Sequence, residues 1–367
     1  MNLEMFDPSK RGELKLTRPR EMSLIEFEKN FPYMELVARE NGSEPKSAEV
    51  LQTKEVLPGV GKFIEIPFPR ALNGNDGRVW HYTNLDSLKS ILNSGSLYAS
   101  SFNYLNDKEE IHFGIKRLKK VLSTVWLSRH VHVKQKQCLR EALIQITENP
   151  QNNLFILSAS VSEDDLAIWN AYGKDNGVSI GLNPSSPVSI LGTSKEFASN
   201  KLPPLFWRKV LYTKTEQEKL LLEMISFLAF SISPDDLPGT NQWSKKVENA
   251  SVLLLSAIAY CKSSEFTFEQ EARIVILGAS DSSINKRQSK YGETPYVKAG
   301  QTNKGPSQGS PRLFASDSLI NLPIVQIYTT PHQEFSSNQR KIEEVLKHND
   351  YDFVNLKGSN IPIRLLN

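Results

Sequence analysis

The chain is short of cysteine: Cys138 and Cys261 are the only two among its 367 residues, and they stand far apart in the sequence. It also has no run of about eighteen apolar residues, the length that a transmembrane helix needs. The amino-terminal stretch has no apolar core of the kind found in secretory signals. These absences predict two reduced thiols rather than a disulfide, and a cytoplasmic protein with no membrane partner.

Several catalytic and metal-binding signatures are missing as well. The sequence contains no G-x-S-x-G nucleophile elbow and no cysteine–histidine signature. The G-V-G-K at residues 59–62 lacks the full spacing of a phosphate-binding loop. His130 and His132 are two residues apart, which on a helix places them on different faces. The acidic residues between Asn106 and Glu110 suit a helix cap better than a cation site, so no metal is expected.

Acidic residues are absent from one long segment, Ile111 to Arg140, although the whole chain has a small net charge of +3. That segment also has apolar residues at helical spacing, which predicts an amphipathic basic helix. A helix of this kind can bind nucleic acid, whereas a solvated helix face is the commoner origin of a charge run. The residues expected to contact nucleic acid are Lys116, Arg117, Lys119 and Lys120.

The order of elements predicts the organisation of the chain. Residues 1–76 have scattered charge and predict an N-terminal extension of unknown role, with one helix near 23–30. The domain at 77–367 mixes helices and short strands without strict alternation, which favours an α+β fold with a mixed or antiparallel sheet. Within it, residues 279–318 are rich in Ser, Gly, Lys and Asn and predict a mobile loop. Expected strands cover 154–161, 177–182, 206–213, 272–277, 323–328 and 361–365, and expected helices cover 163–172, 216–231, 244–262 and 338–347.

The most informative stretch runs from Trp80 to Glu110. It predicts a strand, a helix that is N-capped by Thr83 and ended by Gly95, and a second strand. His81 and Tyr82 come at the end of the first strand, directly before the helix N-terminus, where free backbone amides favour a nucleotide or phosphate. This junction is the expected ligand site. The ligand contacts predicted there are Tyr82, Thr83, Ser100, Asn106 and Asp107.

Two further clusters carry candidate chemistry. In a strand, Glu269, Glu271 and Arg273 point to one face, where the carboxylates can hold a ribose hydroxyl or stabilise a developing cation. The alternative is a charged ladder at the edge of a sheet, with the arginine bridging the glutamates. Trp169 and Tyr172 share one face of a short helix, either as core residues or as a stacking platform.

Taken in this order, the motifs resemble those of a bacterial family known as domain of unknown function 2971 (DUF2971). The resemblance covers about residues 80–364 and leaves out the first 76. The proline that usually follows the aspartate of the polar cluster is missing. The features that carry the resemblance are His81–Tyr82, the N-D-K-E-E cluster at 106–110, Trp169 with Tyr172, the E-x-E-x-R strand Glu269–Arg273, and the closing S-N-I-P-I-R at 359–364.

The order histidine, tyrosine, glutamate is similar, more weakly, to the layout of the ADP-ribosyltransferases. That resemblance implies a split sheet and a site that cleaves NAD, which is then a substrate rather than a cofactor. His81 would hold a ribose hydroxyl, Tyr172 would stack on nicotinamide, and Glu271 would stabilise the oxocarbenium-like ribose. Glu269 would be the second carboxylate. The further substrate contacts would include Trp169 and Arg273. The glycine found beside the histidine in that superfamily is missing here.

The same resemblance implies a protein of bacterial defence or toxin type, whose acceptor is nucleic acid or protein. The alternative is a non-catalytic regulatory module that binds a nucleotide or nucleic acid through residues 81–110 and the basic segment at 111–140. In that case Glu269–Arg273 would be a structural ladder. A metal-dependent phosphodiesterase or nuclease is a third class.

Overall fold

The computed structural model describes residues 66–104, 109–148, 154–173, 176–186, 188–191, 205–277, 283–289, 292–302, 319–331 and 335–362, together with three short strands nearer the N-terminus. Those three strands pair in the order β1-β3-β2. Their bounds are Glu21–Ser23 for β1, Glu55–Val56 for β2 and Lys62–Ile64 for β3. Apart from Ser23, which ends β1, the helix expected near 23–30 lies outside the described residues.

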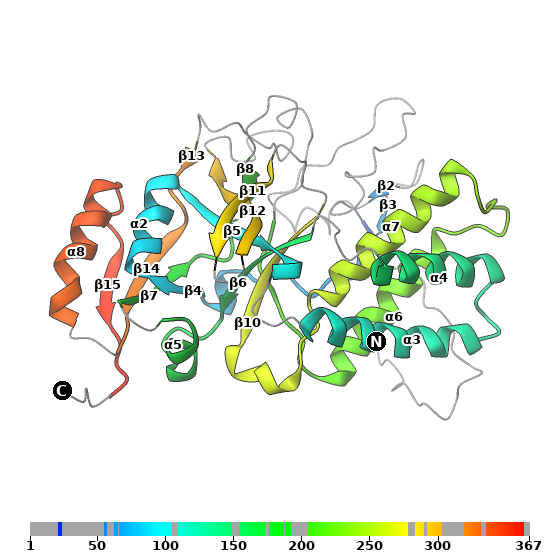
Figure 1. Cartoon of the computed structure of the whole chain (residues 1–367), viewed down its shortest axis with the longest axis horizontal. Coiled ribbons are helices and arrows are strands. Elements are labelled where there is room, and N and C mark those ends of the chain that lie inside the picture. Colours follow the sequence, from blue (N-terminus) through cyan, green and yellow to red (C-terminus); the bar gives the residue numbers. More distant parts are fainter. Residues whose placement is uncertain are drawn as a thin grey trace.

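A mostly antiparallel sheet of twelve described strands runs through the middle of the molecule (Figure 1). Its main path follows the order β11-β12-β5-β6-β4-β7-β14-β15, and β14–β15 is the only parallel strand pair among the described residues. Helices pack against both faces, which is the α+β fold that the sequence predicts. The strands are β4 (Val79–Asn84), β5 (Ser96–Ser101), β6 (Leu154–Ser160), β7 (Gly177–Leu182), β8 (Ser189–Leu191), β9 (Arg208–Lys209), β10 (Glu271–Leu277), β11 (Asn285–Ser289), β12 (Gly292–Thr302), β13 (Leu319–Ile320), β14 (Ile324–Thr329) and β15 (Asn355–Gly358).

The sheet is split beside β6. Along one edge, β6 pairs with β10 over its whole length. Along the other edge, β5 pairs only with Phe155 and Ile156, and β4 pairs only with Ser160. Residues 157–159 therefore have no strand partner on that side, because β4 and β5 diverge from β6 to pair with β7 and β12. This gap positions the candidate site.

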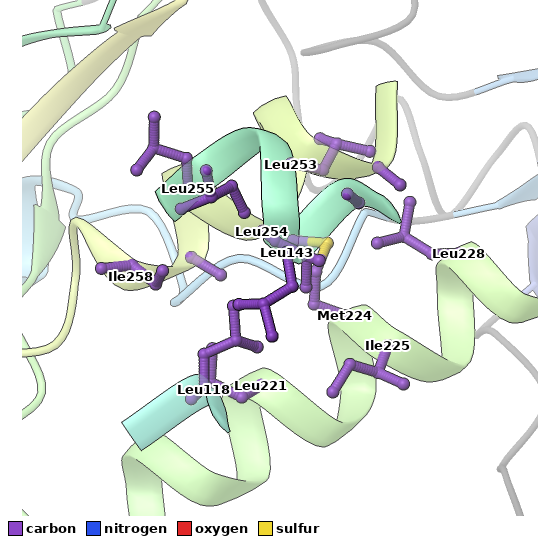
Figure 2. Close-up of a cluster of buried hydrophobic side chains, with 14 of the residues drawn as sticks. Leu118, Leu143, Leu221, Met224, Ile225, Leu228, Leu253, Leu254, Leu255 and Ile258 are labelled. Atoms are coloured by element: carbon purple, nitrogen blue, oxygen red, sulfur yellow. The ribbon is translucent and has the colours of Figure 1, made fainter. Parts of the chain in front are cut away.

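Four helices form a bundle against one face of the sheet, at the right of Figure 1. Figure 2 shows apolar side chains from all four meeting in its core, among them Leu118, Leu143, Leu221 and Leu254. None of the described helices is both long and apolar enough to cross a membrane. The bundle consists of α3 (Glu109–Leu127), α4 (Val133–Glu148), α6 (Lys214–Phe230) and α7 (Asn241–Ile258).

A second core lies on the opposite face, under α2 (Leu85–Ser94) and α8 (Phe335–His348). The alternation of side chains along β6 separates the two cores: Leu154 faces the bundle, whereas Phe155 faces α2 and α8. As the helical spacing predicts, α2 buries Leu85, Leu88, Ile91 and Leu92.

The termini of α2 confirm one expectation and correct another. Gly95 ends the helix with a left-handed φ of 56°. The N-cap is Asn84 rather than Thr83, because β4 continues through Thr83 in its pairing with β7. The Asn84 side-chain oxygen accepts a hydrogen bond from the Ser87 N–H at 2.8 Å.

Three other expected elements differ. The loop expected at 279–318 is wrong for β11 and β12, which pair with each other, while β12 also pairs with β5 and β8. The polar composition of this segment wrongly indicated a loop. Val297 and Ala299 alone supply the apolar side chains that face the core, and hydrogen bonds between backbones hold the polar residues of these strands in the sheet. Only β9 is a strand within the strand expected at 206–213. Beyond it the chain bonds to the segment that follows α7, where the Leu211 N–H donates to Tyr260 O at 2.7 Å. Of the strand expected at 361–365, residues 361 and 362 are not in a strand and the rest lies outside the described residues.

Candidate functional site

A cavity of about 950 Å³ opens at the split in the sheet. Its walls come from β4, β5, β6 and β10, from the first turns of α2, and from the β11–β12 hairpin. A cavity of this size is in the range of small-molecule sites. Of the site residues predicted from the sequence, the cavity is lined by His81, Tyr82, Thr83, Ser100, Tyr172, Glu269, Glu271 and Arg273. Asn106 and Asp107 lie outside the described residues.

The floor of the cavity is a buried network of charges. Lys262, just after α7, places its Nζ 3.0 Å from Glu271 Oε2 and 2.5 Å from Glu269 Oε2. Arg273 binds Glu271 with two parallel hydrogen bonds of 2.7 Å, from Nε and from a terminal nitrogen. Arg273 also forms an ion pair with Glu110, the second residue of α3. Three carboxylates and two cations are thus enclosed together, and no described residues form a metal-ligand group.

The backbone at Glu269 differs from the expected strand. Glu269 ends a short 3-10 helix, Ser264–Glu269, and Gln270 has a left-handed φ of 43°. β10 begins only at Glu271, so strand alternation explains why Glu271 and Arg273 share a face but not why Glu269 joins them. Glu269 reaches the same network because the turn at Gln270 redirects its side chain toward Lys262.

The alternative interpretation of these residues, a charged ladder at the edge of a sheet, does not describe the network. Arg273 is only 1% exposed, and β10 lies between β6 and β9. Burial by itself would raise the pKa of Glu271, but the charges of Arg273 and Lys262 outweigh it and lower the pKa to about 2. Glu271 is therefore ionised at neutral pH.

His81 lies across the gap in the sheet. Its Nδ1 is 3.0 Å from the carbonyl oxygen of Ser158, one of the residues without a strand partner on that side. A carbonyl can only accept, so Nδ1 carries the proton and Nε2 has the free lone pair. Burial lowers the pKa of His81 below its ordinary 6.5, the bond to Ser158 opposes this, and the charge of Arg287 lowers it further. The ring is therefore neutral at neutral pH.

The two aromatic residues of α5 (Leu166–Tyr172) have different environments. Tyr172 lines the cavity, is 40% exposed, and donates a hydrogen bond from its hydroxyl to Glu269 Oε1 at 2.9 Å. Trp169 is fully buried and packs edge-on against Tyr82, with ring centroids 4.8 Å apart. Trp169 does not line the cavity, so its predicted role in binding substrate is wrong and it is a core residue. It sits one helical turn deeper, where it completes the aromatic cluster with Trp80 and Tyr328.

Tyr82 has a positioning role within the wall. Its hydroxyl donates to Ser162 O at 3.0 Å and accepts from the Asp165 N–H at 3.3 Å. Both bonds hold the segment that leads from β6 into α5. Tyr82 therefore helps to fix Tyr172 against the cavity, because α5 carries that side chain.

Among the charged residues of the cavity wall, sequence reasoning missed Lys262 and Arg287, and it assigned Glu110 a different role. Lys262 follows α7 in an ordinary polar segment, and nothing in its local sequence distinguishes it. Arg287 lies in the stretch expected to be a loop. Glu110 was part of the acidic cluster interpreted as a helix cap, yet it is only 4% exposed and pairs with Arg273.

The basic segment forms two helices, α3 and α4, separated by residues 128–132. Lys116, Lys119 and Lys120 are exposed on α3. Arg117 is different, since its side chain is directed to α6, where it donates to Gln217 Oε1 at 3.1 Å and lies 3.9 Å from Glu218. None of these four residues lines the cavity.

Residues 168–274 match the model of a family described as a protein of unknown function (DUF2971). The matched segment contains Trp169, Tyr172 and the Glu269–Arg273 motif, so the resemblance read from those residues is confirmed there. No curated protein and no solved structure matches the chain.

Proposed function

We propose that the chain is an NAD-cleaving enzyme of ADP-ribosyltransferase type, with the split in the sheet as its active site. The observation that carries this proposal is the convergence of His81, Tyr172 and Glu271 on one cavity. These residues come from a strand, a helix and a second strand that are far apart in the sequence. Their order along the chain and their residue types are the features on which the resemblance to the ADP-ribosyltransferases rests.

The chemistry follows from the groups at the cavity wall. The bond that breaks joins ribose C1′ to the nicotinamide nitrogen, and its electron pair leaves with nicotinamide. C1′ then bonds to water or to an acceptor oxygen or nitrogen, which releases its proton. The positive charge that develops on the ribose needs a nearby anion. Glu271 is an ionised carboxylate at the cavity wall and is assigned that role.

The other two residues position the substrate. The half-exposed ring of Tyr172 offers a face on which nicotinamide can stack. The Nε2 of His81 can accept a hydrogen bond from a ribose hydroxyl, because Nδ1 is already bound to Ser158. Glu269 accepts from the Tyr172 hydroxyl and so orients that ring. Glu269 is therefore a positioning residue in this mechanism rather than a second catalytic group.

The test is nicotinamide release from NAD by the purified protein, compared with Glu271→Gln. Removal of one such charge stabiliser costs about 10²–10³ in rate, so release should fall by that factor while circular dichroism shows a folded protein. Glu265→Gln is the matched control, because Glu265 is exposed on the same 3-10 helix that Glu269 ends and does not line the cavity.

A second variant keeps the test valid if Glu271→Gln does not fold. Tyr172→Ala removes a partly exposed ring and leaves the ion pairs of Glu271 intact, so it should fold and should raise KM for NAD. Release that is absent from the wild type, or that is unchanged in both variants, would contradict the proposal.

The alternative, a non-catalytic nucleotide-binding module, is supported by one observation. Lys262 holds both Glu269 and Glu271 in short ion pairs, as expected for carboxylates whose role is structural. Under that proposal NAD or another nucleotide binds the folded protein and no nicotinamide is released.

A further inference from the structure

Arg287 is a cation in the cavity wall whose described partners are all neutral. It lies on β11, and one of its terminal nitrogens donates to Ser100 Oγ at 3.0 Å. Its guanidinium carbon lies 5.6 Å from the ring centroid of Tyr98 and 5.7 Å from that of Tyr296. No ion pair joins it to any described carboxylate. The adjacent Lys286, by contrast, pairs with Glu293 at 2.8 Å.

The two tyrosines hold this guanidinium in place. Their ring centroids are 4.4 Å apart, and they come from neighbouring strands, β5 and β12. Contacts of this kind between a cation and aromatic rings fix the direction of the side chain without neutralising its charge. Arg287 is exposed, so its remaining N–H groups stay available to a ligand in the cavity.

The surrounding wall is rich in hydroxyl groups. The floor holds three carboxylates, each with a cation beside it, whereas Asp86 on α2 is the one other described carboxylate that lines the cavity, and the wall near Arg287 contributes mainly small neutral hydroxyl groups. A planar guanidinium with several N–H donors matches the oxygens of a phosphate group, and hydroxyls can donate to the remaining oxygens. The lining hydroxyl residues on β4, α2, β5 and the β11–β12 hairpin are Thr83, Ser87, Ser90, Ser100, Ser289 and Thr294. Ser90, Ser289 and Thr294 already donate to backbone carbonyl groups, so the donors expected for a phosphate are Thr83, Ser87 and Ser100.

We propose that Arg287 binds a phosphate group of the nucleotide that occupies the cavity. The hydroxyl-rich end then takes the phosphate part of the ligand, while the end at Glu271 takes the ribose that reacts. This inference rests on the proposed function for the nucleotide, but it does not require that the ligand be cleaved. Arg287 is a binding residue that selects phosphorylated ligands over the corresponding nucleosides.

The test uses ADP-ribose and adenosine as probes, with dissociation constants measured by calorimetry and by competition. Arg287→Gln should weaken ADP-ribose binding by about 10- to 100-fold, the usual range for a lost hydrogen bond to a charged group. Arg287→Lys should fall between Arg287→Gln and the wild type, because a lysine keeps the charge and loses the planar fork. Lys286→Gln is the matched control, because it removes the adjacent cation on the same strand. It should leave the affinity for ADP-ribose unchanged, because Lys286 does not line the cavity and is paired with Glu293.

The outcomes separate this inference from the proposed activity. A selective loss of ADP-ribose affinity in Arg287→Gln supports it, even if the wild type releases no nicotinamide. It is overturned if ADP-ribose does not bind the wild type, if Arg287→Gln changes the affinity no more than Lys286→Gln does, or if adenosine binding weakens by the same factor.

Discussion

The Nδ1 of His81 lies 3.0 Å from the carbonyl oxygen of Ser158 and joins β4 to β6 where the backbone pairing between them has stopped. The same imidazole lines the cavity. One side chain thus supplies the hydrogen bond that a strand neighbour would otherwise supply, and it leaves Nε2 free for a ligand. The gap in the sheet remains open without leaving this carbonyl unpaired.

Substitution of His81 should show how much its hydrogen bond to Ser158 contributes to stability. His81→Ala leaves the Ser158 carbonyl without its partner and should lower the free energy of unfolding by about 1–3 kcal/mol. His81→Asn can donate from its amide nitrogen at nearly the same place and should lower it less. Urea denaturation of the three proteins at pH 7.5 measures both effects. Equal losses in the two variants would show that the hydrogen bond is not what His81 contributes.

The same variants should differ from the wild type in their response to acid. Burial holds the pKa of folded His81 below 6.5, so below that pH the unfolded chain binds more protons than the folded one. Stability therefore falls as the pH drops from 6.5 toward the pKa of the folded state. His81→Asn lacks this contribution, so the difference in unfolding free energy between wild type and variant should shrink between pH 7.5 and 5.5. Parallel curves would contradict this.

Glu271 should show a titration of the same sign as that of His81, but at lower pH. Its pKa of about 2 lies below the ordinary 4.5, so its contribution to stability is complete above pH 4.5 and is lost as the pH falls toward 2. Glu271→Gln breaks a buried ion pair and should cost about 3–5 kcal/mol at pH 7. The cost should be smaller in urea denaturation at pH 3.5, whereas the exposed control Glu265→Gln should change little at either pH.

Local patterns predicted the parts of the site that lie close together in the sequence. The spacing of apolar residues indicated α2 between two strands, and so placed His81 and Tyr82 at its N-terminal end. Alternation along β10 placed Glu271 and Arg273 on one face. Each of these inferences uses a period of two or 3.6 residues within a single element, which the sequence displays directly.

The rest of the site depends on contacts between distant segments. Glu110 and Lys262 are more than 150 positions apart, and only the packing of α3 beside α7 brings both to the cavity floor. Gln270 takes a left-handed conformation that residues other than glycine seldom adopt, so no local pattern indicated the turn at Glu269. Arg287 was missed because β11 is polar and is held by backbone pairing to β12.

Gly114 should be intolerant of alanine although it lies inside α3. Alanine favours a helix by about 1 kcal/mol over glycine, but a Cβ at this position would lie 2.1 Å from Cγ2 of Ile258 on α7. Overpacking of this kind costs about 1–3 kcal/mol, so Gly114→Ala should lower the midpoint of urea denaturation. In an Ile258→Ala background the contact with Cγ2 is removed and only the contact of 3.2 Å with the Cβ of residue 258 remains, so Gly114→Ala should cost less there than in the wild type. A stabilising Gly114→Ala in the wild-type background would contradict this close packing of α3 against α7.

The exposed lysines of α3 are the part of the nucleic-acid prediction that can be tested separately. Lys116, Lys119 and Lys120 lie at helical spacing on one face, and the proximity of Lys214 at the start of α6 lowers the pKa of Lys120. A concentration of positive charge at one place is what attracts a phosphate backbone. Arg117 is not part of this surface, because its side chain forms a hydrogen bond with Gln217 and an ion pair with Glu218.

The triple variant Lys116→Gln, Lys119→Gln, Lys120→Gln should therefore weaken binding of a single-stranded oligonucleotide. The slope of log affinity against log salt should become shallower by about 0.7 for each phosphate contact that is lost. The matched control removes the same charge from α8, on the opposite face of the sheet, through Arg340→Gln, Lys341→Gln and Lys347→Gln. If both triple variants bind alike, or if the wild type shows no salt-dependent binding, the α3 surface is a solvated helix face and the acceptor is not nucleic acid held there.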